Sequence, residues 1–242
     1  MDAMKPLVII PTYNEAESIL KVIEGLLENP YHLINVLVVD DGSPDGTADI
    51  VANRKSSRVH LIRREAKSGL GSAYRAGFEW ALTYPEYTHI VTMDGDNSHL
   101  PSDLNRMLAR SSVYDLVIGS RWIQGGEAAN WPLSRRVLSR AGSTYSRIAL
   151  GLPFRDITGG FRVYTRRLIE ALDLGRISSE GYCFQIEMLL RSYRAKMRIT
   201  EAPITFVERV QGKSKMSKAI VKEAIRNVSI WGLCYRLGLM RD

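Results

Sequence analysis

The stretch HIVTMDGDNSHLP, residues 89–101, joins an apolar run to a proline suited to the first turn of a helix. The run HIVTMD (89–94) is typical of a buried strand, and residues 101–110 have helical spacing. Two carboxylates, Asp94 and Asp96, stand at the end of this strand. They repel each other unless a cation or hydrogen-bond donors lie beside them. The stretch therefore predicts both a strand–turn–helix unit and a site at its turn.

The same unit recurs along the first 120 residues. Continuous runs rich in Val and Ile alternate with segments that have helical spacing and polar faces. Expected strands cover 7–11, 36–41, 59–64, 89–94 and 116–121, and expected helices cover 15–28, 45–53, 70–83 and 101–110. This alternation predicts an α/β fold, in which helices flank a mostly parallel central sheet through right-handed crossovers.

The second half of the chain has a less regular pattern. Helical spacing covers 132–150, 182–195 and 219–237, a glycine-hinged turn enters a strand within 156–164, and 197–209 alternate like a strand. Residues 210–218 form a basic loop of small residues. The chain contains no repeat, low-complexity tract or clear linker, so we expect a single domain over residues 1–242.

Polar residues follow most of the expected strands at the point where each strand ends. Tyr13 and Glu15 follow the first strand, Asp41 ends the second, and Arg121 ends the fifth. Because ligands of parallel sheets bind beyond the carboxyl ends of the strands, we expect the site at this edge.

The pair Asp94 and Asp96 can be interpreted as structural or as functional. A single aspartate at a strand end usually caps a helix or completes a turn. Two carboxylates beside Asp41 instead favour Mg²⁺ or Mn²⁺, which prefer carboxylate oxygens and fill their remaining positions with water and substrate phosphates. The predicted ligand is a metal-bound nucleoside diphosphate. The glycines of KSGLGSAY (67–74) match neither a P-loop nor a dinucleotide fingerprint.

Composition narrows the class of protein and of partner. The chain has 242 residues, of which 45% are hydrophobic, but it has no apolar run of membrane-spanning length and no signal-peptide pattern. Its two cysteines and four histidines show neither a disulfide framework nor a zinc spacing. Residues 1–120 carry a net charge of −5 and residues 121–242 a net charge of +12. We therefore expect the second half to meet nucleic acid, a membrane surface or a phosphorylated substrate.

The motifs together resemble one family. They are PTYNE, VVDDGSPDGT, KSGLGSAYRAGF, MDGDNSH, GSRW, DITGGFRVY, GYCFQIEM and VERVQGKSKM. The chain resembles the polyprenol-phosphate (dolichol-phosphate) mannose synthases from residue 7 to about residue 218, and most of all the actinobacterial polyprenol monophosphomannose synthases. These are inverting glycosyltransferases of the GT-A (Rossmann-like) fold. The resemblance implies a GDP-mannose donor, a polyprenyl monophosphate acceptor and a divalent metal.

The resemblance also implies roles for individual residues. The catalytic residues would be Asp96, Arg121 and Lys215, and the metal would bind Asp96. Ser98 stands where some relatives have Gln, so its place as a metal ligand stays open. The acceptor phosphate would bind Arg121, Arg135 and Ser139. Donor-binding residues would be Pro11, Tyr13, Glu15, Val39, Asp41, Asp94, Gly95, Asp96, Arg209 and Lys215.

The implied reaction needs no strong general base, because a phosphate monoester with a second pKa of about 6 is already a nucleophile. The chain would consist of a nucleotide and metal half (1–120), an acceptor half (121–216) and an amphipathic C-terminal helix (217–242). That helix would either pack on the core of the domain or lie on the cytoplasmic face of the membrane, with a membrane-anchoring partner protein as a further possibility.

Two alternatives and one residue stay open. The sugar could be another one, such as glucose from UDP-glucose, carried to the same lipid phosphate. A nucleotide- or nucleic-acid-binding module is disfavoured, because the aromatic residues near basic ones fit core positions and such binding needs no Asp-x-Asp at a strand end. Asp156 could complete a turn or orient a neighbour in the site.

Overall fold

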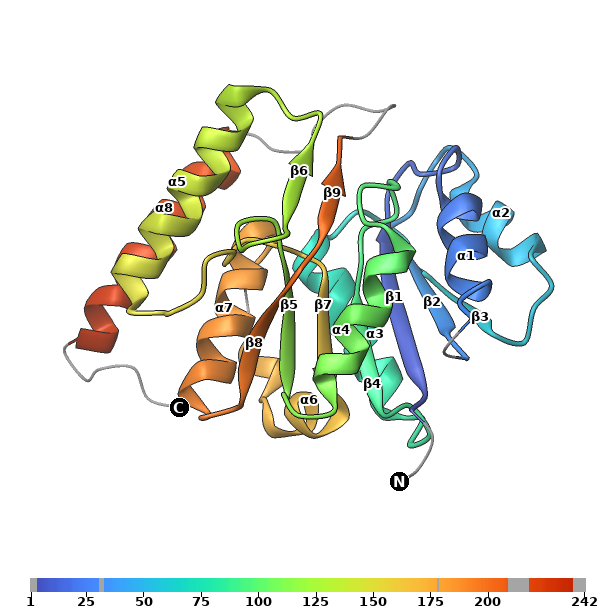
Figure 1. Ribbon diagram of the computed structural model, residues 1–242. Helices are drawn as coiled ribbons and strands as arrows, with labels where there is room; N and C mark the ends of the chain where they lie inside the picture. Colours follow the sequence, from blue (N-terminus) through green and yellow to red (C-terminus); the bar gives the residue numbers. More distant parts are fainter. Residues whose placement is uncertain (1–3, 31–32, 178, 209–217, 237–242) are drawn as a thin grey trace.

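The computed structural model describes residues 4–30, 33–177, 179–208 and 218–236 (Figure 1). The five expected strands of the first half are present as β1 (Pro6–Thr12), β2 (Asn35–Asp40), β3 (Val59–Arg63), β4 (His89–Thr92) and β5 (Leu116–Ser120). They alternate with α1 (Ile19–Leu27), α2 (Thr47–Asn53), α3 (Leu70–Leu82) and α4 (Pro101–Ser111). The predicted α/β fold is confirmed.

The central sheet has seven strands in the order β3-β2-β1-β4-β7-β5-β8. β1 to β4 pair in parallel, and β8 (Ile199–Pro203) runs parallel to β5. β7 (Arg162–Thr165) runs antiparallel to both of its neighbours, β4 and β5. The carboxyl ends of β1, β2, β4 and β5 therefore meet at one edge, where the start of β7 joins them.

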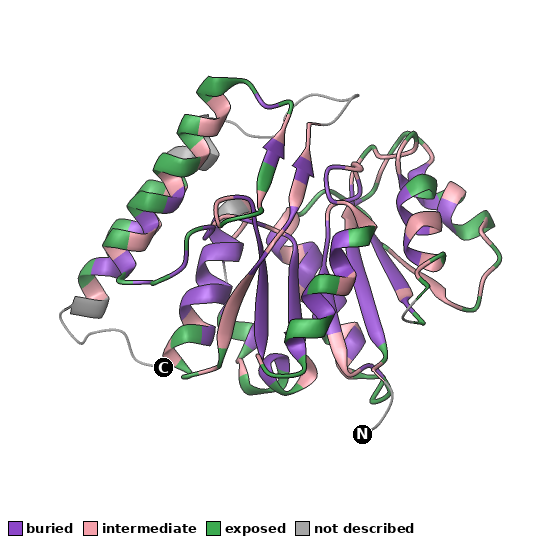
Figure 2. Cartoon of the chain, viewed as in Figure 1, coloured by how far each residue is buried: buried purple, intermediate pink, exposed green. Residues whose placement is uncertain are grey.

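Helices cover both faces of the sheet (Figure 1). Apolar residues of α1, α2 and α4 pack on one face, and those of α3, α6 (Arg166–Ala171) and α7 (Gly181–Arg194) pack on the other. Because both faces are covered, the inner strands are buried along almost their whole length (Figure 2). This double burial explains why their sequences are continuous apolar runs.

Two elements differ in their bounds from those expected from the sequence. The helix expected from residue 15 begins at Ile19, because the preceding residues bond to neighbouring loops: the Glu15 N–H donates to the Thr47 hydroxyl (3.0 Å) and the Ser18 hydroxyl to the Gly95 carbonyl (2.7 Å). The single strand expected over 197–209 is wrong. Since β5 ends at Ser120, the chain leaves the main sheet after β8 and continues as β9 (Thr205–Val207).

Several short elements of the second half, including α6, were not predicted or fall within longer predicted segments. β9 pairs in parallel with β6 (Glu127–Ala129) to form a second, two-stranded sheet. A 3-10 turn at Leu174–Arg176 follows α6, and β7 begins only at Arg162. Short segments of this kind lack the periodicity from which helices and strands are predicted.

α5 (Leu133–Leu150) and α8 (Lys218–Arg236) lie side by side at one end of the molecule and run in the same direction (Figure 1). The Tyr145 and Ser229 hydroxyls are 2.7 Å apart, and a Cβ on Gly232 would stand 2.5 Å from the Ala149 carbonyl oxygen. The glycine thus lets the two helix backbones approach closely. Among the described residues, no helix is long and apolar enough to cross a membrane.

Candidate active site at the carboxyl edge of the sheet

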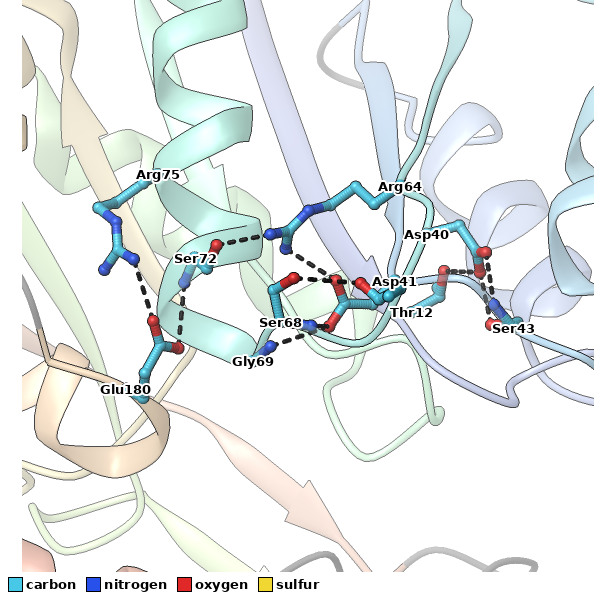
Figure 3. Close-up of polar contacts among 11 residues, drawn as sticks. Thr12, Asp40, Asp41, Ser43, Arg64, Ser68, Gly69, Ser72, Arg75 and Glu180 are labelled. Carbon is cyan, nitrogen blue, oxygen red and sulfur yellow. Dashed lines mark hydrogen bonds and ion pairs between the residues drawn. The ribbon is translucent and has the colours of Figure 1, made fainter.

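Asp40, the last residue of β2, fixes the turn that follows it. Its buried carboxylate accepts hydrogen bonds from the Thr12 hydroxyl (2.8 Å) and from the Ser43 N–H (2.9 Å) and hydroxyl (Figure 3). The ends of β1 and β2 are therefore tied together, which places Pro11 and Tyr13 beside Val39 and Asp41. These four residues are predicted donor-binding residues.

Asp41 is held from the opposite side by the loop before α3. One carboxylate oxygen accepts from the Ser68 N–H (2.9 Å) and the Gly69 N–H (3.0 Å), and the other lies 2.8 Å from the Arg64 guanidinium (Figure 3). Asp41 is 5% exposed. Its carboxylate is thus already engaged by the protein, and it shapes the pocket by holding this loop. Lys67 of the same loop lies over the Tyr13 ring, 4.1 Å from the centroid.

The start of α3, which follows this loop, is anchored to Glu180, directly before α7. The Glu180 carboxylate accepts from the Ser72 N–H (3.1 Å) and from the Arg75 guanidinium (3.0 Å) (Figure 3). A Cβ on Gly71 would stand 2.3 Å from the Ser179 carbonyl oxygen, and Gly69 has a φ of +101°. The glycines of the KSGLG stretch are therefore required by close packing and by a left-handed backbone.

Asp94 and Asp96 lie in the turn after β4. The Asp94 N–H donates to Nδ1 of His99 (3.1 Å), and Oδ1 of Asp96 accepts from the Ser98 N–H (3.0 Å). Asn97, which lies between Asp96 and Ser98, has a φ of +61°, a conformation that asparagine tolerates. The Asp94 side chain is 35% exposed, so it faces both the protein and the open edge. The turn that carries the two carboxylates is therefore held in place by the protein.

His99 supports this turn as a neutral side chain. Burial lowers its pKa, although the nearby Asp94 and Asp96 act in the opposite direction. Since Nδ1 accepts a hydrogen bond from the main chain, the neutral ring carries its proton on Nε2. The ring packs against Phe161 and Phe206, at centroid distances of 5.0 Å in both cases. His99 therefore fixes the position of Asp94 relative to β9.

The oxygen atoms of this turn suit a hard divalent cation better than a soft one. Besides the two carboxylates, the Ser98 hydroxyl is buried and has no hydrogen-bond partner within the described residues. Within the described parts of the chain, no group of three or more His, Cys, Asp or Glu side chains could hold a metal ion by itself. A cation here would have to complete its coordination with water or with substrate oxygens, as Mg²⁺ commonly does.

Arg121, directly after β5, is paired with Asp156. Its Nε and Nη2 donate to the two carboxylate oxygens at 2.8 and 2.7 Å, and its N–H donates to the same carboxylate at 2.9 Å. Arg121 is 7% exposed and Asp156 is fully buried. Asp156 therefore orients Arg121, which decides between the two roles that the sequence left open.

A cavity of about 320 Å³ opens between α5, α8 and the body of the protein. Its wall is mostly apolar, and its polar positions include all three residues predicted to bind the acceptor phosphate. We call it the α5–α8 cavity. It is lined by Arg121, Trp131, Arg135, Leu138, Ser139, Ala141, Gly142, Tyr145, Ser146, Thr158, Ile186, Ala224 and Ile225.

Arg135 is positioned by two groups. Its guanidinium pairs with Glu208, which follows β9, and lies over the ring of Trp131 at 4.1 Å from the centroid. The Trp131 indole N–H is buried without a hydrogen-bond partner among the described residues, so a free donor lies beside the cation. Trp131 and Glu208 were missed in the sequence, because a tryptophan before a helix and a glutamate after a short strand have common structural roles.

The structure thus gathers the predicted residues into two groups. Pro11, Tyr13, Glu15, Val39, Asp41, Asp94, Gly95, Asp96 and Ser98 lie at the ends of β1, β2 and β4, and Arg121, Arg135 and Ser139 line the α5–α8 cavity. Arg209 and Lys215 lie outside the described residues. The individual roles of all these residues stay predictions.

Comparison with known proteins identifies the family. Residues 7–173 match the sequence profile described as "Glycosyl transferase family 2". The chain belongs to this family. The glycosyltransferase fold extends beyond the matched residues. A glucosyl-3-phosphoglycerate synthase from Mycobacterium tuberculosis, solved with Mn²⁺ and UDP-glucose, aligns with 99% of this chain and 81% of its own at a TM-score of 0.69 and 18% identity.

Two curated relatives of this glycosyltransferase are similar over nearly their whole length. The chain is 51% identical to "Undecaprenyl-phosphate mannosyltransferase" of Micrococcus luteus, over 96% of both chains. It is 47% identical to "Polyprenol monophosphomannose synthase" of Mycolicibacterium smegmatis, over 98% of this chain and 90% of the relative. The resemblance found in the sequence motifs and the predicted GT-A fold are confirmed.

Proposed function

We propose that this glycosyltransferase transfers mannose from GDP-mannose to a polyprenyl monophosphate, which gives polyprenyl-phosphate β-mannose and GDP. The α5–α8 cavity is the observation that carries the proposal. A polyprenyl phosphate has an anionic head on an apolar chain, and the cavity has the cations of Arg121 and Arg135 on an otherwise mostly apolar wall. The names of the two relatives, which share about half of their residues with this chain, support the same substrate class.

The carboxyl ends of β1, β2 and β4 are the proposed donor site. Tyr13 and Asp41 would border the nucleoside, and Asp94 and Asp96 would lie at the diphosphate. Asp96 would hold Mg²⁺ or Mn²⁺, with the buried Ser98 hydroxyl as a further oxygen within the same turn. When bound, the cation would offset the negative charge of the departing diphosphate. Structures of the glucosyl-3-phosphoglycerate synthase with Mn²⁺ or Mg²⁺ support a divalent ion.

The residues present account for catalysis without a general base. The acceptor phosphate is a nucleophile at neutral pH, so the protein has to hold it in line with the anomeric carbon and to stabilise charge. Arg121 presents a planar guanidinium that Asp156 holds in one orientation, and Arg135 is held by Glu208 and Trp131. Fixed donors of this kind need no reorganisation as the reaction proceeds. Lys215 and Arg209 are proposed to bind the donor diphosphate.

The exposed side of the α5–α8 pair supports attachment to a membrane surface. Leu133, Val137 and Ile148 of α5 are 76%, 59% and 64% exposed, and Leu233 of α8 is 60% exposed. The three α5 positions recur on one face of the helix. With the net charge of +12 over residues 121–242, this surface suits anionic lipid headgroups. We propose peripheral binding at the cytoplasmic face, and a partner protein as an additional anchor.

The proposed division of labour follows the two groups of residues. Residues 1–120 would bind nucleotide and metal, residues 121–216 would bind the acceptor, and residues 217–242 would add the amphipathic helix. All three would belong to one domain, because β7 and β8 of the second half complete the sheet of the first.

The test of the proposed function is a titration calorimetry panel with GDP-mannose, GDP-glucose, UDP-glucose and UDP-N-acetylglucosamine, in Mg²⁺ and then in chelator. We expect metal-dependent binding of GDP-mannose alone, followed by mannose transfer to polyprenyl phosphate in detergent. Tighter binding of a UDP-sugar would replace GDP-mannose as the proposed donor, but the proposed location of the donor site would stay the same. If none of the four binds, even with polyprenyl phosphate present, the proposed function fails.

A further inference from the structure

Gln185 on α7 is a buried polar side chain that the site described so far does not use. The residue is 2% exposed, and neither its amide nitrogen nor its amide oxygen has a hydrogen-bond partner within the described residues. Most buried amides are paired, because an unpaired one loses its bonds to water without replacement. An apolar side chain of similar length, such as Met, would fill the same space without this cost.

The main chain around Gln185 is held by a buried cation. Arg162 is fully buried, and its Nη1 donates to the Gln185 carbonyl oxygen at 2.6 Å. Its Nε donates to the Gly159 carbonyl oxygen (2.9 Å) and its Nη2 to the Ile157 carbonyl oxygen (2.7 Å). Arg162 therefore fixes the start of α7 against the Gly159–Gly160 segment. The unpaired amide of Gln185 is in a defined place and is not the result of a loose backbone.

That place lies beside Asp94. β4 and β7 are antiparallel with Thr92 opposite Arg162, so the continuing chains bring Asp94 opposite Gly160. A Cβ built on Gly160 would lie 3.7 Å from Oδ1 of Asp94 and 3.7 Å from Nε2 of Gln185. Apart from the chain neighbours of Gly160, no other atom of the described residues lies within 4 Å of this Cβ, and Gly160 is partly exposed. The Asp94 carboxylate and the Gln185 amide thus border the same small space over Gly160.

This space lies between the two proposed substrate sites. On the donor side it borders Asp94. On the acceptor side, a Cβ on the neighbouring Gly159 would lie 3.4 Å from Oδ1 of Asp156, the carboxylate that orients Arg121. Ile186, the residue after Gln185, lines the α5–α8 cavity. A sugar that is transferred from the donor diphosphate to the acceptor phosphate has to occupy the space between Asp94 and the Asp156–Arg121 pair.

We propose that Gln185 binds a hydroxyl group of the transferred hexose, in the space that Gly160 leaves open beside Asp94. An amide offers two donors and two acceptors, so it suits a hydroxyl that both donates and accepts. The absence of a side chain at Gly160 would be required by the sugar and not by the backbone, because Gly160 has no positive φ. This inference rests on the proposed function, and it adds a residue that discriminates between sugars.

The test compares two ligands that differ only in the sugar. Titration calorimetry in Mg²⁺ measures the Kd of GDP and of GDP-mannose for the wild-type protein and for Gln185→Met. We expect Gln185→Met to bind GDP-mannose about 10- to 100-fold more weakly and to bind GDP within about twofold of wild type, since only the sugar loses a partner. Gln124→Met, the same change at an exposed position, should alter neither constant.

A second variant acts through shape. Gly160→Ala places a methyl group in the proposed hydroxyl site. It should also weaken the binding of GDP-mannose and leave the Kd of GDP unchanged. Gly175→Ala, whose added Cβ meets a single carboxylate oxygen at 3.4 Å in the 3-10 turn, is the matched control. Among 2-, 3-, 4- and 6-deoxy GDP-mannose, one analogue should bind wild type about 10-fold more weakly and bind Gln185→Met no more weakly than GDP-mannose does.

The failures are distinguishable. One outcome is that the wild-type protein binds GDP-mannose and transfers mannose, but Gln185→Met and Gly160→Ala change the Kd of GDP and the Kd of GDP-mannose by the same factor. In that case Gln185 has a structural role and this inference is wrong. If every deoxy analogue loses affinity equally in both proteins, it is wrong as well. If the wild-type protein binds no GDP-mannose, the proposed function is wrong, and this inference, which rests on it, is wrong too.

Discussion

The carboxyl ends of β1, β2 and β4 and the α5–α8 cavity are built from differently spaced residues. At the strand ends, Tyr13, Asp41 and Asp96 each follow a strand within four residues. The cavity instead takes its lining from Arg121 after β5, from the loops before α5 and β7, and from α5, α7 and α8, over more than 100 residues of chain. A parallel sheet brings its strand ends together by topology alone. A cavity between helices depends on how those helices pack.

The two regions also differ in how their charges are held. At the strand ends, the Asp40 and Asp96 carboxylates accept hydrogen bonds from main-chain N–H groups two or three residues further along the chain, those of Ser43 and Ser98. The cations of the cavity pair with acids that are distant in sequence, Arg121 with Asp156 and Arg135 with Glu208. Loss of a residue at the strand ends should therefore affect mainly chemistry, whereas loss of a pair at the cavity should also affect folding.

The largest expected effect is at the strand ends. Asp96→Ala should lower mannose transfer by about 10³-fold or more, because it removes the proposed metal ligand that offsets charge on the leaving diphosphate. Metal-dependent calorimetric binding of GDP-mannose should be lost, while the melting temperature changes little. Asp173→Ala, which removes an exposed carboxylate paired with Arg176, serves as the control. Full activity of Asp96→Ala would remove Asp96 from the site.

Asp156→Ala tests the cavity side and should act first on stability. It removes the carboxylate that accepts three hydrogen bonds from the buried Arg121, which costs about 3–5 kcal/mol and lowers the melting temperature by about 6–20 °C. Asp115→Ala is the matched control, because Asp115 is equally buried but its partner Arg198 is 59% exposed and stays solvated. Equal losses of melting temperature in the two variants would contradict the special role of the buried pair.

Arg135→Ala separates the two regions most directly. The KM for polyprenyl phosphate should rise about 10- to 100-fold through loss of a charge-assisted contact, and the calorimetric Kd of GDP-mannose should stay within about twofold. Arg147→Ala on the same helix, away from the cavity lining, should change neither. A large loss of GDP-mannose binding in Arg135→Ala would show that the donor and acceptor sites are not divided as proposed.

The smallest effect is expected on the outer face of α5. Val137→Glu should weaken sedimentation with vesicles of anionic and zwitterionic lipid by about 3- to 10-fold, because it replaces an exposed apolar side chain with an anion. Val113→Glu, at a similarly exposed valine after α4, is the control. Transfer to a short, water-soluble polyprenyl phosphate should be unchanged. If both variants bind vesicles as wild type does, α5 does not meet the membrane.

The sequence by itself determined the elements and the location of the first group of site residues. Apolar runs such as LVIIP and VLVVD are long enough to fix buried strands, and a polar residue directly after such a run lies at the carboxyl edge whatever the rest of the chain does. Asp41, Asp94 and Asp96 could therefore be predicted before any packing was known. The family resemblance gave Arg135 and Ser139 of the cavity, which periodicity alone would not have indicated.

Only the tertiary structure decided which distant residues meet. The pairing of Arg121 with Asp156 and of Arg135 with Glu208, and the division of the expected 197–209 strand into β8 and β9, depend on where β5 ends and how α5 docks. The unpaired amide of Gln185 beside Gly160 depends on the antiparallel β7, which the sequence did not reveal. Strand and helix formation are local and periodic, whereas these contacts arise from the packing of elements far apart in the chain.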